Sequence, residues 1–164
     1  MSFDPKSNYP QEPRVSFGQA VAIGIGAGAI GALVMLGTEK IEQLFTGRPN
    51  SYVPATATGN LFGLDRHRHP DLVNHVHHFG MGMMNGPIRA VMSYFGVIGP
   101  FSSFMFTGIR IFMDQWVEIS AGASALPWTW PINEQIIDIF HKGVYAIISG
   151  YLCDRYIRGV TWFN

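Results

Sequence analysis

Cysteine and charge are both scarce in this sequence. Cys153 is the only cysteine, which excludes an internal disulfide framework. Charged residues make up 13% of the chain, about half of the usual globular share. The formal net charge is zero, so nothing indicates a nucleic acid as a partner. Residues 1–14 are polar, with acids and prolines, and resemble neither a signal peptide nor a transit peptide.

Catalytic motifs are missing as well. The glycine-rich run AIGIGAGAIG lies inside an apolar stretch, whereas a dinucleotide-binding loop would follow a strand. No Ser/His/Asp or Cys/His spacing indicates an activated nucleophile. The sequence therefore leaves open whether the protein is an enzyme.

One long apolar run stands near the start of the chain. Residues 17–36 contain no charge, and about 20 apolar residues suffice to cross the hydrocarbon core of a bilayer. We predict a first span at residues 15–37. Small residues recur at every fourth position along it, at Ala20, Gly24, Gly28 and Ala32. Such a seam lets a second helix approach closely, either within the chain or, in a homo-oligomer, from another copy.

The rest of the chain divides into a polar connection and three more helices. The connection covers residues 38–70 and contains prolines that interrupt regular structure. The predicted helices follow at residues 71–98, 100–120 and 131–155. We therefore expect a single all-α domain, an integral membrane bundle of about four transmembrane helices with a polar, charged interior. Its partner is then the lipid bilayer, and the positive-inside rule favours cytoplasmic termini.

A polar stripe runs along the last helix. Glu134, Asp138, His141, Tyr145 and Ser149 follow one another at intervals of three or four residues, which places them on one helix face. The other positions are apolar almost all round. Ionisable residues inside a membrane are costly, and they face partners or a wet cavity and mark function.

Similar stripes on the preceding two helices complete a candidate site. Its members are Asp114, Glu118, Glu134, Asp138, His141, Arg89, Arg110 and Lys142. The acids and the histidine would bind or relay a cation or proton, and the basic residues would balance charge or hold an anionic group. This predicts small-solute or proton- or ion-coupled binding or transport. A dry ion-pair network that fixes the packing is the structural alternative.

Two other functions stay open. Asp138 and His141 have the three-residue spacing of carboxylate–histidine pairs in di-iron bundles, and the histidine-rich segment around residues 67–78 suits copper or zinc. A metal site would use His75, His78, Asp138 and His141, in a membrane-embedded metal- or haem-dependent enzyme acting on a lipid-soluble substrate. No cofactor is firmly implied. Alternatively, the chain is a structural or scaffold subunit joined through the small-residue seam.

Three features carry a resemblance to known families. They are the glycine-rich first span, the stretch Leu126-Pro127-Trp128 and the element Asp138-Ile139-Phe140-His141 before a closing arginine segment. With them, the last two-thirds of the chain resembles a group of small, uncharacterised fungal integral membrane proteins. It is more distantly similar to the YagU-like family of bacterial inner-membrane proteins. The resemblance implies a membrane bundle and no particular activity.

Overall fold

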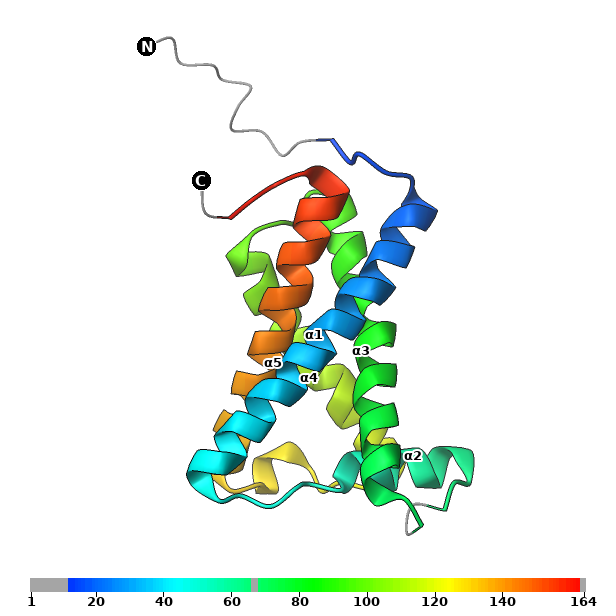
Figure 1. Ribbon diagram of the computed structural model, residues 1–164, viewed down its shortest axis with the longest axis vertical. Helices are drawn as coiled ribbons and strands as arrows, with labels where there is room; N and C mark the ends of the chain where they lie inside the picture. Colours follow the sequence, from blue (N-terminus) through cyan, green and yellow to red (C-terminus); the bar gives the residue numbers. More distant parts are fainter. Residues whose placement is uncertain (1–11, 66–67, 163–164) are drawn as a thin grey trace.

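Five α-helices make up the fold in the computed structural model, which describes residues 12–65 and 68–162 (Figure 1). No strand occurs in these ranges, so the all-α prediction is confirmed for them. The helices are α1 (Phe17–Thr46), α2 (Val53–Phe62), α3 (Pro70–Tyr94), α4 (Pro100–Ser120) and α5 (Ile132–Cys153). A 3-10 turn, η1 (Pro127–Thr129), precedes α5, and a π-helical turn, η2 (Asp154–Arg158), follows it.

The four long helices α1, α3, α4 and α5 form an elongated bundle, and the short helix α2 lies across one end of it (Figure 1). We call this the open end. There α1 and α4 finish, and α3 and α5 begin. The opposite, closed end holds η2 and the turn between α3 and α4. The described chain ends also meet there, where the backbone N–H of Arg14 donates to the carbonyl of Ile157 at 2.7 Å.

Helix α1 starts with a reciprocal cap and ends beyond its apolar stretch. The backbone N–H of Gln19 donates to the Ser16 hydroxyl, and the Gln19 side chain accepts from the backbone N–H of Ser16. The helix continues well past residue 37 and stops at Gly47, whose φ of 69° suits glycine. The segment after the apolar run, residues 37–46, therefore extends the helix by nearly three turns.

The small-residue seam packs against α3 within the chain. Ala20, Gly24, Gly28 and Ala32 are all buried. They face a second row of small residues on α3, formed by Gly82, Gly86 and Ala90. A methyl group added at Gly28 would overlap the carbonyl oxygen of Gly82. The seam thus joins two helices of one chain, and an oligomer built on α1 would need another of its faces.

Helix α2 was not expected in the polar connection. Pro54 lies in its first turn, where proline is compatible with a helix because the N–H there has no helical partner. Two contacts fasten α2 to α3. The Asn74 side-chain oxygen accepts from the backbone N–H of Ala55 at 3.1 Å, and Thr58 Oγ1 lies 2.9 Å from His77 Nδ1. Tertiary packing supports this short helix.

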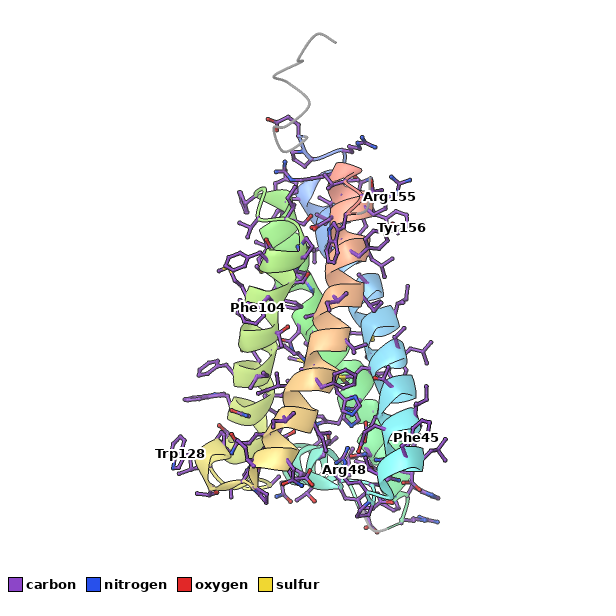
Figure 2. All side chains as sticks on the ribbon, turned by 90° about the vertical axis from the view of Figure 1, so that its left-hand side faces the viewer. Phe45, Arg48, Phe104, Trp128, Arg155 and Tyr156 are labelled. Atoms are coloured by element: carbon purple, nitrogen blue, oxygen red, sulfur yellow. The ribbon has the colours of Figure 1, made fainter. Side chains whose placement is uncertain are left out.

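Charged side chains occupy the interior, and large apolar side chains occupy the surface. Arg89 and Arg110 are among the largest fully buried side chains, at 0% and 1% exposure. Phe45, Phe104 and Trp128 are 87%, 74% and 75% exposed and point away from the bundle (Figure 2). Two helical stretches of the described chain, Phe17–Thr46 and Ile132–Arg158, are long and apolar enough to cross a membrane.

Candidate functional site

A cavity of about 330 Å³ lies at the open end of the bundle. The last turns of α1 and α4 and the first turns of α3 and α5 contribute its walls, together with the segments around residues 48–54 and 123–131. Its lining is rich in ionisable side chains. The acids are Glu39, Asp114, Glu118, Glu134 and Asp138, and the basic residues and histidines are Arg48, Lys142, His77, His78 and His141.

Helix geometry explains why these side chains converge. Asp114 and Glu118 are four residues apart near the end of α4, so they share a face. Asp138 and Lys142 have the same spacing on α5, one turn after Glu134. Because α4 and α5 pack side by side, the two rows meet across the cavity.

Lys142 joins the two rows at the cavity's inner wall. Its Nζ lies 2.5 and 2.7 Å from the carboxylate oxygens of Asp138 and 3.7 Å from Oδ2 of Asp114. Arg110 Nε lies 3.2 Å from the same Asp114 oxygen. The Arg110 guanidinium stands 4.5 Å from the centroid of the Tyr145 ring, an arrangement that stabilises the cation. Asp114 is therefore held between two cations.

Arg48 links α1 to α5 at the rim of the cavity. Its guanidinium donates to the Glu42 carboxylate at 3.0 and 3.2 Å and reaches Glu134 at 3.5 Å. Burial lowers the pKa of Arg48, but the hydrogen bonds and charges of these acids outweigh burial and raise the pKa above its ordinary value. His141 Nε2 lies 3.7 Å from Glu42, and its Nδ1 lies 3.2 Å from Thr38 Oγ1.

The sequence analysis did not include Glu42, Arg48 or Thr38 in the site. Glu39 and Glu42, one turn apart after the apolar run, are a signal that could have pointed to α1 as a further wall. Arg48 follows the helix, and no periodic pattern relates it to Glu134, which is 86 positions away.

Seven of the eight predicted binding or relay residues gather at the open end. These are Arg110, Asp114, Glu118, Glu134, Asp138, His141 and Lys142. Arg89 does not join them. Its guanidinium pairs with Asp154 at 2.9 Å, and both side chains are fully buried at the closed end. The expectation that Arg89 balances the charge of these acids is therefore not met by any contact.

Asp154 organises the closed end. Its Oδ2 accepts from Arg89, from the backbone N–H of Gly99 at 2.7 Å and from the Trp162 indole at 2.9 Å. Arg158, also buried, donates to the backbone carbonyls of Ser93 and Tyr94. These bonds tie η2 to the turn between α3 and α4.

The predicted metal ligands do not assemble into one set. His78, Asp138 and His141 line the cavity, but His75 is exposed and lies outside its lining. No group of three or more His, Cys, Asp or Glu side chains in the described part of the chain is placed to hold a metal ion. His67, part of the histidine-rich segment, and residues 1–11 of the polar lead lie outside the described residues.

Comparison of the chain with protein-family models, curated proteins and solved structures gave no match. The resemblance to the fungal and YagU-like membrane proteins therefore stays a prediction. What the site does has to be argued from its own geometry and charge.

Proposed function

We propose that this chain is an integral membrane protein whose helices α1, α3, α4 and α5 cross the bilayer. Large apolar side chains face outward and charged side chains face inward, which is the reverse of the arrangement in a water-soluble protein. This distribution supports the proposal, because lipid accommodates the exposed apolar faces while the buried charges pair inside. The shortest of the four, α4, has 21 residues and is about 31 Å long. That length matches the hydrocarbon core of about 30 Å.

The outer faces of the bundle suit lipid along its length. Helix α4 exposes a row of aromatic rings, among them Phe101, Phe104, Phe112 and Trp116. Trp128 lies at the open end and points outward (Figure 2). Tryptophan is enriched at the boundary between lipid and water. The cavity then opens close to one membrane surface and reaches inward between the helices.

We further propose that the cavity binds a small cationic solute or ion as a step in its transport. The observation that carries this proposal is the charge of the lining, where five acids stand against Arg48 and Lys142. A concave site with low-dielectric walls focuses such a field and concentrates cations. The volume lies at the lower end of the range of about 300–1,000 Å³ usual for ligand sites. His141, between Thr38 and Glu42, is placed to take part in a coupled proton movement.

Flux measurements on the purified protein in liposomes test this proposal. The probes are protons, followed with a trapped pH dye, and the tracers ²²Na⁺ and methylammonium. We expect the protein to carry at least one of them faster than protein-free liposomes do. Asp138→Asn should lower that flux about tenfold or more, because the substitution removes a lining carboxylate that also orients Lys142.

A folded protein that carries none of these probes and binds none in detergent would contradict the proposal. The charged interior would then be an ion-pair network that fixes helix packing. The membrane assignment has its own check, since an integral membrane protein stays in the pellet after alkaline carbonate washing.

A further inference from the structure

Four of the five cavity carboxylates already have a partner within the protein. Asp138 binds Lys142, and Asp114 lies between Lys142 and Arg110. Glu134 reaches Arg48, and Glu39 accepts a hydrogen bond from Gln43 at 3.2 Å. Each of these four acids thus has at least one partner before any solute arrives.

Glu118 is the exception. Its side chain lines the cavity and forms no hydrogen bond or ion pair with any residue of the described chain, although Glu118 is only 7% exposed. One turn earlier on the same face, Oδ1 of Asp114 is buried and also has no hydrogen-bond partner in the described structure. Side chains four residues apart on a helix are about 5–6 Å apart at Cβ. The Glu118 carboxylate and Oδ1 of Asp114 are thus two acceptor groups on one helix face that accept no hydrogen bond in the described structure.

The wall of the cavity is partly apolar. Met35 on α1, Val53 and Pro54 at the start of α2, and Trp130 with Ile137 line the same cavity. The aliphatic part of this wall offers a hydrated metal ion or a bare alkali cation no ligand atom, whereas a short hydrocarbon chain gains free energy from each CH₂ buried there. The Trp130 ring also offers a face that attracts a cation.

We infer that the cavity's ligand is a small organic amine in its ammonium form, with Glu118 as the anchoring carboxylate. The ammonium N–H groups donate to Glu118 and to Oδ1 of Asp114, and the apolar body lies against Met35 and Trp130. An ammonium has three donors and no acceptor, which fits the Glu118 carboxylate and the one oxygen of Asp114, Oδ1, that accepts no hydrogen bond. This inference rests on the proposed function and adds to it a ligand class and the residue that selects it.

Isothermal titration of the full chain in mild detergent tests the inference. The probes are n-butylammonium, 1-butanol, which keeps the apolar body without the charge, and Na⁺, which keeps the charge without the body. We expect n-butylammonium to bind at least tenfold more tightly than either of the other two. Glu118→Gln, almost the same size, should weaken that binding at least tenfold. Glu118→Asp should weaken it less, because the charge remains.

Asp71→Asn is the matched control. Asp71 also lies at the open end, but it is exposed, accepts from the Tyr52 hydroxyl and is not part of the cavity lining. It should leave the affinity unchanged, so an equal loss in Asp71→Asn and Glu118→Gln would show a general field effect and overturn the role of Glu118. Unchanged binding in Glu118→Gln would overturn it too, while the cavity would stay a cation site. If Na⁺ binds as tightly as n-butylammonium, the ligand class is wrong.

Absence of n-butylammonium binding in the wild-type protein would overturn this inference, whereas the proposed function fails only if the protein also carries none of protons, ²²Na⁺ and methylammonium in liposomes. Thermal unfolding of each variant shows whether a loss of binding comes from a loss of fold. Glu118→Asp keeps the inference testable if Glu118→Gln does not fold.

Discussion

At the closed end a single carboxylate, Asp154, accepts from a guanidinium, a backbone N–H and an indole, all within 2.9 Å. At the open end five acids share the donors of Arg48, Arg110, Lys142 and Gln43, which is less than one donor side chain per acid, and Glu118 accepts no hydrogen bond in the described chain. Both ends contain buried charge. They differ in whether the protein itself supplies the partners.

This difference distinguishes charged residues that stabilise the fold from charged residues that can bind a ligand, and burial alone does not distinguish them. A fully buried ion pair fixes the register of the elements it joins, here η2 and the turn after α3. A carboxylate that is buried and unpaired costs free energy in the free protein, and a ligand of opposite charge recovers that cost. Buried charge alone would place both ends of the bundle in the functional site. The hydrogen-bond and ion-pair partners of the acids favour the open end only.

The largest expected effect is at the closed end. Asp154→Asn leaves the Arg89 guanidinium buried without a countercharge, and breaking such a pair costs about 3–5 kcal/mol. Asp138→Asn, its counterpart at the open end, should cost about 1 kcal/mol or less, because Lys142 keeps Asp114 nearby and Asp138 is partly exposed to the cavity. Free energies of unfolding in mixed SDS and mild detergent measure both. Equal losses would mean that the two ends do not differ.

A smaller loss of stability is expected in the small-residue seam between α1 and α3, which lies between the two ends of the bundle. Gly28→Leu forces α1 away from the Gly82 carbonyl and should cost about 1–3 kcal/mol, the usual range for overpacking. Because α1 and α3 run from one end to the other, amide hydrogen exchange should speed up both in α2 and in η2. Gly26→Leu is the control, since a Cβ atom added there meets nothing within 4 Å beyond the backbone of its own helix. Faster exchange at one end only would show that the ends are held independently.

The smallest effect is expected at the rim of the cavity. Arg48→Gln removes the links to Glu42 and Glu134, which lie close to water, and should cost about 1 kcal/mol or less. The loss should shrink in high salt, since salt screens exposed pairs. Lys40→Gln removes the same charge from an exposed position on the same end and should cost less. If Arg48→Gln lowered the free energy of unfolding by several kcal/mol, the Arg48 ion pairs would be buried structural pairs like the one at the closed end.

The local parts of the fold could be read from periodicity. The predicted helix at residues 100–120 has those bounds in α4, and the seam on α1 is buried as a close helix contact. The stripe on α5 placed Asp138 and His141 on one face because 3.6 residues per turn leave no other arrangement. These features depend on residues a few positions apart.

Features that join distant segments could not be read in this way. Arg89 and Asp154 are 65 positions apart, and nothing along the chain marks them as partners. Helix α2 is too short to be stable alone, and it forms where α3 offers Asn74 and His77 as partners.

By itself, the sequence determined a helical chain with apolar outer faces and inward-facing charged stripes, because helix geometry and the cost of unpaired charge leave little choice. Only the tertiary structure decided which charge meets which. It paired Arg89 with Asp154, brought Arg48 to the cavity rim and left Glu118 without a partner, since pairing depends on how whole helices pack.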